Sequence, residues 1–264
     1  MGNRARSNVG RLIDIGSSDN NKVEKMFLDD LKRSIEMTDK KNSRLPSKTF
    51  KPSSMQCKRN SYYQIIGEAM DDNESSFTMI GICNSGSDIH ERIQGAVSKM
   101  FTNNINCHWL DIGRYVRENG LSDVVVRQQI GFETKLYNQR YNISFMCDGL
   151  IEYNGVKYIL EIKTETSRKW FSRSGVDKKH YNQAIAYSCS LDLEDVIFLY
   201  VSRDTLDIKS YMFHVTDDMR KGLIDYVVDV EGYVDRHIAP PKDADIPRSV
   251  CNYCVYKTAC RRDK

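Results

Sequence analysis

An aspartate, a glutamate and a lysine stand where a β-hairpin could bring them together. Asp148 precedes, and Glu161 and Lys163 follow, the dipeptide Asn154-Gly155 in the segment NISFMCDGLIEYNGVKYILEIKTE. Asn-Gly between β-branched and aromatic residues is the strongest short-range signal of a hairpin. Counting outward from a two-residue turn places Asp148 opposite Glu161, with Lys163 on the same face.

Two carboxylates at this spacing repel each other unless a cation lies between them. Hard oxygen ligands favour Mg²⁺ or Mn²⁺. Such an ion would polarise a phosphodiester and lower the pKa of a bound water, while Lys163 would orient the water or stabilise negative charge. The pattern therefore predicts phosphodiester hydrolysis. The alternative is an exposed hairpin face with solvated ion pairs, and a β-bulge would break the register.

The surrounding pattern predicts an α/β fold in which helices flank a mixed central sheet. The hairpin is expected over Asn142–Lys163, and the apolar run Asp195–Ser202 is expected to form a central strand that pairs with Asp207–Val215. Thr216 is expected to cap the last helix and Pro240-Pro241 to end it. Apolar periodicity and sequence context predict helices over residues 21–40, 55–67, 86–101, 180–190 and 217–237.

Composition narrows the class of protein. The 264 residues carry 39 Lys and Arg against 36 Asp and Glu, so any nucleic-acid surface must be a local groove. The chain has no apolar run long enough for a membrane span and no apolar segment typical of a secretory signal, which indicates a cytoplasmic protein. In that setting its eight cysteines favour a metal site over disulfides.

Asp148 and the run Glu161-Ile162-Lys163 resemble the core signature of PD-(D/E)XK nucleases. Upstream, the GxxxH pattern ending at His90 is similar to a helix motif of the RecB-like branch, and downstream a QxxxY pattern resembles its second helix motif. The resemblance implies metal ligation by His90, Asp148 and Glu161, with help from the Ile162 carbonyl, and a catalytic role for Lys163. It also implies that the residues of the QxxxY motif, Gln183 and Tyr187, position the DNA and the active-site groups.

One early and three late cysteines resemble the set in the AddB nuclease domain and in the four-cysteine CRISPR-associated exonucleases. That resemblance implies a [4Fe-4S] cluster that ties the two ends of the domain together. Zinc is the alternative. The four implied ligands are Cys57, Cys251, Cys254 and Cys260, and the remaining cysteines, Cys83, Cys107, Cys147 and Cys189, are expected to be small buried side chains.

These observations predict a polar N-terminal extension with one helix over residues 1–50, and a nuclease domain over residues 51–264 that includes the cysteine segment 251–260. The expected function is a DNA exonuclease that acts on single-stranded or frayed ends in recombination, repair or phage- or CRISPR-type DNA processing. The alternative is a DNA-binding or adaptation subunit that works with a helicase, an integrase or another recombination partner. The residues expected to contact DNA are Arg168, Lys169, Trp170, Arg173, Lys178 and Lys179.

Overall fold

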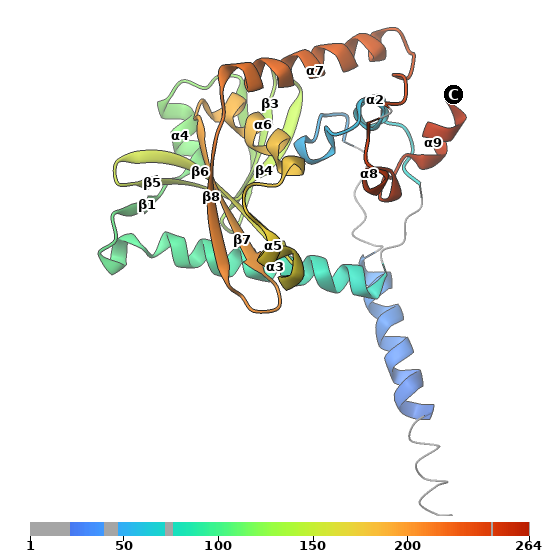
Figure 1. The fold of residues 1–264 in the computed structure, drawn as a ribbon, viewed down its shortest axis with the longest axis horizontal. Helices are drawn as coiled ribbons and strands as arrows, with labels where there is room; N and C mark the ends of the chain where they lie inside the picture. Colours follow the sequence, from blue (N-terminus) through green and yellow to red (C-terminus); the bar gives the residue numbers. More distant parts are fainter. Residues whose placement is uncertain (1–21, 40–46, 72–75, 244, 264) are drawn as a thin grey trace, which may run out of the picture. The chain divides into compact units, whose positions relative to one another are not determined.

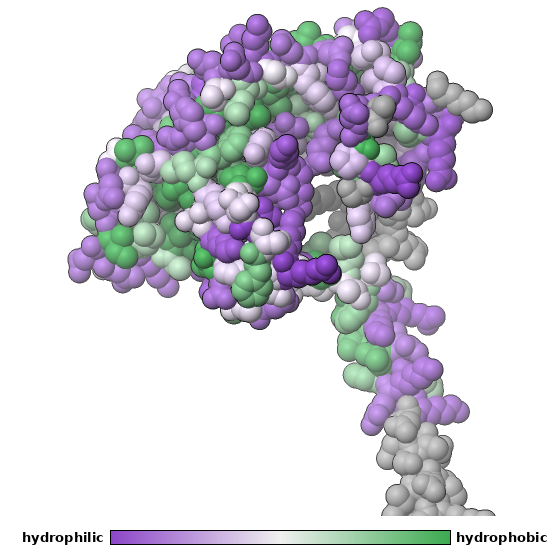
Figure 2. Space-filling model, viewed as in Figure 1, coloured by the Kyte–Doolittle hydropathy of each residue, from purple (hydrophilic) through white to green (hydrophobic). Residues whose placement is uncertain are grey.

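The computed structural model describes residues 22–39, 47–71, 76–243 and 245–263. The chain divides into two compact units: Met1–Leu45 with Asn73–Asn84, and Pro46–Asp72 with Ser85–Lys264. In the first unit, residues 22–39 form the helix expected over 21–40. Figure 2 shows apolar residues along one side of this helix and polar residues along the other. Most of the expected extension before and after that helix lies outside the described residues.

The centre of the second unit is a five-stranded mixed sheet with the order β1-β5-β6-β7-β8 (Figure 1). Strands β6 and β7 run parallel, and the other neighbours in this sheet pair antiparallel. The expected mixed sheet with a central apolar strand is therefore confirmed. The strands are β1 (Cys107–Trp109), β5 (Gly149–Tyr153), β6 (Val156–Glu165), β7 (Asp195–Ser202) and β8 (Ile208–His214).

Helices cover both faces of this sheet, as expected. The helices of the described chain after residue 46 are α2 (Lys58–Ile66), α3 (Phe77–Ser98), α4 (Ile112–Glu118), α5 (Ser167–Ser172), α6 (Tyr181–Leu191), α7 (Asp217–Asp235), α8 (Arg248–Asn252) and α9 (Lys257–Arg262), with 3-10 turns η1 (Pro52–Ser54), η2 (Phe101–Asn103) and η3 (Lys178–His180). Helix α3 packs on one face, and α6 and α7 contribute to the apolar cluster on the other. Figure 1 shows α7 in orange, with α6 between it and the strands.

The alternation of side chains along β6 decides which face carries the polar residues. Leu160 and Ile162 pack against Ile89 and Ile93 of α3 in one apolar cluster. Ile159 belongs to the other and larger cluster, which also contains residues of α6 and α7. Because successive residues of a strand point to opposite faces, Glu161 and Lys163 share the face of Ile159.

The β5–β6 hairpin has the expected register. Asn154 and Gly155 have φ angles of 52° and 82°, the positive values that a tight two-residue turn needs. Tyr153 pairs with Val156, and the ladder continues without a bulge to the pair of Gly149 with Leu160. The next position along each strand is therefore Asp148 opposite Glu161.

The expected first strand of that hairpin was too long. Its earlier half is a separate strand, β4 (Ile143–Cys147), which belongs to a second sheet with the order β2-β3-β4. The other members, β2 (Val124–Ile130) and β3 (Glu133–Asn138), were not anticipated. Asp148 consequently lies at the point where the chain passes from one sheet to the other.

Several helix boundaries also differ from the expectation. Helix α3 begins at Phe77, nine positions before the expected start, and α2 begins after the 3-10 turn at Pro52–Ser54. Thr216 caps α7 through Oγ1, which accepts from the Met219 N–H as expected, but the helix already ends at Asp235. No helix in the described part of the chain is long and apolar enough to cross a membrane.

Candidate metal centre and catalytic site

Asp148 is held rigidly at the junction of the two sheets. Its carboxylate Oδ2 accepts a hydrogen bond of 2.7 Å from the backbone N–H of Ile162 on β6. The side-chain amide of Gln94 on α3 donates to the Asp148 carbonyl, also at 2.7 Å, and is itself buried. Since only 6% of Asp148 is exposed, these bonds fix both its backbone and its carboxylate.

Gly149 allows Trp109 to pack directly behind Asp148. A Cβ atom at this glycine would lie 2.4 Å from the Trp109 ring, far inside van der Waals contact. The indole in turn packs edge-on against the ring of Phe132, at 5.4 Å between centroids. The absence of a side chain at position 149 is therefore what lets the aromatic pair close the back of the site.

Glu161 and Lys163 form a buried ion pair on the same face of β6. The Lys163 Nζ lies 2.5 Å from Oε1 of Glu161, and only 2% of Glu161 is exposed. Among the described residues, none forms a hydrogen bond to the other oxygen, Oε2, although that atom is buried. A buried acceptor without a donor is costly, so this oxygen suits a cation ligand.

The charges in the site alter two ionisation equilibria on β6. Burial, and then the negative charge of Asp148, raise the pKa of Glu161 to about 7. Burial alone would lower the pKa of Lys163, but the carboxylates of Glu161 and Asp148 outweigh it and raise that pKa. The lysine therefore stays protonated, while the two carboxylates compete for stabilising positive charge.

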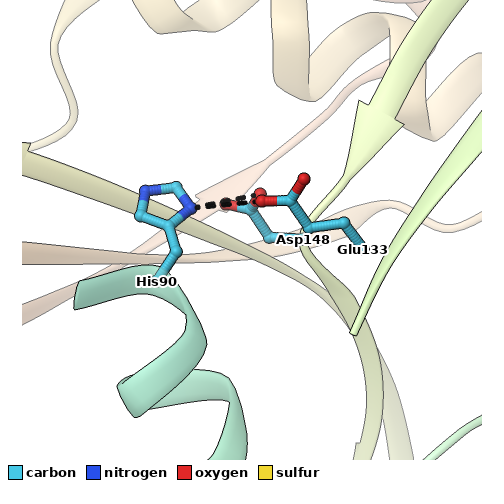
Figure 3. A group of neighbouring side chains, drawn as sticks. All are labelled: His90, Glu133 and Asp148. Atoms are coloured by element: carbon cyan, nitrogen blue, oxygen red, sulfur yellow. Dashed lines mark ion pairs between the residues drawn. The ribbon is translucent and has the colours of Figure 1, made fainter. Parts of the chain in front are cut away.

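His90 of α3 points its Nδ1 toward two neighbouring carboxylates, those of Asp148 and of Glu133 on β3 (Figure 3). Its Nδ1 is 3.5 Å from Asp148 Oδ1 and 3.7 Å from Glu133 Oε1. One ligand atom of each residue lies within 4.8 Å of the other two, and no other such group of potential ligands occurs in the described part of the chain. Burial opposes protonation of His90, but the two carboxylates raise its pKa to about 9.

This donor set fits a divalent cation. Two carboxylates and an imidazole are ligands that Mn²⁺ accepts, and the oxygens also suit Mg²⁺. The structure brings His90 and Asp148 together as the sequence predicted. Glu161 lies beside Asp148 but outside the three-residue group. Ile162 contributes its N–H to Asp148, and a role for its carbonyl stays a prediction.

Glu133 was missed because its strand was missed. It begins β3 directly after the pair Gly131-Phe132, and Ile130 pairs with Glu133 across that turn. Gly131 has a φ of 59°, which glycine adopts readily at the first position of a two-residue hairpin turn. Gly131, which stands between two runs with β-branched residues, was thus the available signal of a hairpin turn. It would have placed the Glu133 carboxylate at the start of a strand.

The two residues expected to position the DNA and the active-site groups, Gln183 and Tyr187, lie behind Asp148. Tyr187 on α6 donates from its hydroxyl to the Met146 carbonyl at 2.8 Å and stacks on Phe145, with 4.7 Å between ring centroids. Burial, followed by the charges of Glu161 and Asp148, raises the pKa of Tyr187 well above its usual value, while a hydrogen bond with Gln183 opposes this. Tyr187 is thus a neutral donor that anchors the strand leading into Asp148.

A cavity of about 240 Å³ lies beside Lys163. Of the residues expected to contact DNA, Lys169 and Lys179 line it. It is lined by Lys163, Thr164, Glu165, Thr166, Lys169, Lys179, His180 and Arg203.

The other residues expected to contact DNA divide into two kinds. Arg168 and Lys178 are exposed. The Arg173 side chain is only 5% exposed and pairs with Glu165 at 2.5 Å. Trp170 donates from Nε1 to the Tyr200 carbonyl at 2.9 Å. Arg173 and Trp170 therefore serve the protein's own packing in this structure. The next aromatic residue, Phe171, is 66% exposed.

Three of the four expected cluster ligands lie near one another. Burial raises the pKa of Cys57, and the charges of Cys254 and Cys260 contribute in the same direction. Asn60 Nδ2 and the Tyr256 N–H each donate to the Cys254 sulfur at 3.4 Å. Among the described residues, however, no three cysteines bring their sulfur atoms within 4.8 Å of one another, and Cys251 is exposed, so the cluster stays a prediction. Of the other cysteines, Cys107 and Cys147 are buried as expected and Cys189 is half-buried, but Cys83 is exposed.

No protein-family model and no curated protein sequence matches the chain. Among solved structures, a protein named SSO0001 shares 14% identity with a TM-score of 0.49, covering 90% of this chain and 98% of that one. An alkaline exonuclease from Laribacter hongkongensis shares 10% identity with a TM-score of 0.45, covering 73% and 90%. The same exonuclease in complex with dAMP gives 11% identity and a TM-score of 0.37, covering 81% and 95%. These values are too low to support a functional argument, which therefore depends on the geometry of the site.

Proposed function

We propose that this chain is a divalent-metal-dependent nuclease that hydrolyses DNA phosphodiester bonds. The observation that carries the proposal is the buried Glu161 carboxylate, which has one oxygen on Lys163 and the other without a protein donor among the described residues, beside Asp148. A purely structural ion pair would leave no buried oxygen unsatisfied. Anionic cation ligands beside one fixed ammonium group can serve phosphodiester hydrolysis, since both supply positive charge to the reacting phosphate.

Asp148, Glu161, His90 and Glu133 would hold the cation, which would supply positive charge to the scissile phosphate and to the attacking water. The chain's own part is to keep these ligands fixed. The Ile162 N–H and the Gln94 amide hold Asp148, and a positioned carboxylate loses little entropy when a ligand arrives.

Lys163 would act on the reacting phosphate directly. Its ammonium is held beside Glu161, and its raised pKa keeps it charged at neutral pH. A fixed positive charge in a buried site stabilises the negative charge that develops as the water attacks. Tyr187 and Gln183 are proposed as positioning residues, because the tyrosine anchors the Met146 carbonyl two residues before Asp148.

We infer an exonuclease that acts on single-stranded or frayed ends. The lysine-lined cavity continues from Lys163, so one strand that passes the metal site would meet further positive charge there. Exposed Arg168, Lys169, Lys178 and Lys179 would supply phosphate contacts, and the exposed ring of Phe171 could stack on a base.

The cysteines are proposed to bind a [4Fe-4S] cluster, with zinc as the alternative. The donors around Cys254 are of the kind that stabilise metal-bound thiolates. Cys57 precedes α2, while the other three ligands lie in the last segment of the chain. A cluster would therefore join distant parts of the chain and stabilise the domain. Purified protein with broad absorbance near 400 nm would support the cluster, and stoichiometric zinc without iron would support the alternative.

A metal-dependent assay tests the proposed activity. Wild-type protein should degrade end-labelled linear single strands with Mg²⁺ or Mn²⁺ and lose that activity in chelator. Closed circular single strands should persist if the enzyme acts from ends. Glu161→Gln should abolish cleavage, while Glu118→Gln on exposed α4 should not. DNA binding without cleavage would instead support a subunit that acts with a helicase or integrase.

A further inference from the structure

The cavity beside Lys163 carries more positive than negative charge. Apart from His180, its lining has one acidic residue, Glu165, and four basic residues, Lys163, Lys169, Lys179 and Arg203. That carboxylate is already neutralised, because both of its oxygens accept from Arg173, at 2.6 and 2.5 Å. The remaining charge of the cavity is therefore positive.

Two of the cations form no ion pair within the described part of the chain, although the charge of Asp177 acts on Lys179 and that of Arg203 acts on Asp204. Lys169 lies 2.7 Å from Asp177, and Lys163 pairs with Glu161. Among the described residues, neither Lys179 nor Arg203 has a carboxylate oxygen within ion-pair distance. Their positive charge is thus available to an anion that enters the cavity.

Lys179 is held close to another lysine. Burial, and then the positive charge of Lys169, lower the pKa of Lys179. Crowding of like charges in a partly buried place is unfavourable, and an anion between the two ammonium groups would relieve it. Asp177, which lies 2.7 Å from the Lys169 ammonium, offsets this crowding in part, and an anion that enters the cavity would offset it further.

The other lining groups suit an oxyanion. Thr164 and Thr166 also line the cavity, and threonine hydroxyls can donate hydrogen bonds to phosphate oxygens. The wall is also fixed, since the Arg203 N–H donates to the Glu165 carbonyl at 2.8 Å. At about 240 Å³ the cavity has roughly eight times the ~30 Å³ that a water occupies in the liquid, which leaves room for a phosphate group.

We propose that this lysine pocket binds a second phosphate group of the substrate strand, distinct from the one that is cleaved. The inference rests on the proposed function, because Lys163 borders both the metal site and the pocket. The bound group is either the terminal phosphomonoester of a strand or the next internal phosphodiester. Both present the same oxyanion to Lys179, Arg203 and the threonine hydroxyls.

Lys179→Gln and Arg203→Gln test the pocket, with Lys221→Gln on exposed α7 as a charge-matched control. Anisotropy with a labelled single-stranded oligonucleotide, without divalent cations, should show binding at least about five-fold weaker for each pocket variant. The slope of log affinity against log salt should fall by about one. The control should bind like wild type, and thermal melting should show that all variants are folded.

Cleavage measurements should separate positioning from chemistry. The pocket variants should raise KM with little change in kcat, because they remove binding that is uniform along the reaction. A loss confined to 5′-phosphorylated oligonucleotides, absent with 5′-hydroxyl ends, assigns the pocket to a terminal phosphate. An equal loss with both, and with circular strands in the binding assay, assigns it to an internal phosphodiester.

The two proposals can fail separately. If wild type cleaves DNA but both pocket variants bind and cleave as the control does, the pocket proposal is wrong and the nuclease stands. If wild type never cleaves DNA yet the pocket variants bind oligonucleotide more weakly than the control, the phosphate pocket stands and the nuclease proposal fails.

Discussion

Lys163 donates to Oε1 of Glu161 at 2.5 Å, while Oε2 of the same buried carboxylate accepts from no residue in the described part of the chain. The carboxylate is thus half-satisfied within the protein. Desolvation of the free oxygen is unfavourable, and a cation ligand would remove that cost. The incomplete pairing leaves Oε2 available to a cation.

Replacing Glu161 by glutamine should abolish cation binding without loss of the fold. The amide keeps the shape of the side chain but removes the charge that a divalent cation requires, and it also removes the repulsion with Asp148. We expect Mn²⁺ affinity in calorimetry to fall at least about 100-fold and the melting temperature to stay equal or rise. Unchanged Mn²⁺ affinity would remove Glu161 from the site.

Glu133→Gln should weaken Mn²⁺ binding by roughly 10- to 100-fold. The glutamate comes within 3.7 Å of His90 and belongs to the group with Asp148. The matched control is Glu118→Gln, which removes an exposed carboxylate whose one ion-pair partner among the described residues is Arg114. If both variants bind Mn²⁺ like wild type, Glu133 is not a ligand and serves only to orient the histidine.

Gly149→Ala should destabilise the domain by about 1–3 kcal/mol. The new Cβ would overlap Trp109, and the backbone next to Asp148 would have to move. Gly222→Ala on α7 is the control, since a Cβ added there would have nothing within 4 Å and alanine favours a helix. Denaturant unfolding should show opposite signs for the two changes. Equal effects would contradict the close packing of Trp109.

The buried neutral His180 should contribute a stabilisation that is lost below about pH 6.5. Burial, and then the charges of Lys163 and Lys179, lower its pKa to about 2, against about 6.5 in the unfolded chain. Between pH 2 and pH 6.5 the His180 ring binds a proton in the unfolded chain but not in the folded chain. The stabilisation from this group is therefore complete above pH 6.5 and is lost as pH falls. The slope from this group is at most about 1.4 kcal/mol per pH unit.

Between pH 7.5 and 5 the unfolding free energy should rise more steeply with pH in wild type than in His180→Gln. Glu161, whose raised pKa acts in the opposite direction, contributes to the slope of both proteins. The substitution also removes the contact of Nδ1 with the Tyr200 hydroxyl at 2.8 Å, so slopes are compared rather than absolute stabilities. His237→Gln, at an exposed position, should keep the wild-type slope. Identical slopes in all three proteins would show that His180 is not the responsible group.

Local sequence determined the hairpin and its register. Asn154-Gly155 adopts the positive φ angles that a tight turn of this type requires, and an unbroken ladder from that turn aligns Asp148 with Glu161. Both follow from short-range geometry, which neighbouring residues specify without help from the rest of the chain. For the same reason the cap at Thr216 and the central strand Asp195–Ser202 were predictable.

Tertiary structure alone decided which distant groups meet at Asp148. Glu133 reaches the site because β3 pairs with β4, and Gln94 reaches it because α3 packs on the second apolar cluster. Neither contact has a local sequence signature, since each depends on pairing or packing between segments far apart in the chain. The sequence by itself therefore determined the facing carboxylates, and long-range packing decided the third carboxylate, the buried supports and the positive cavity beside Lys163.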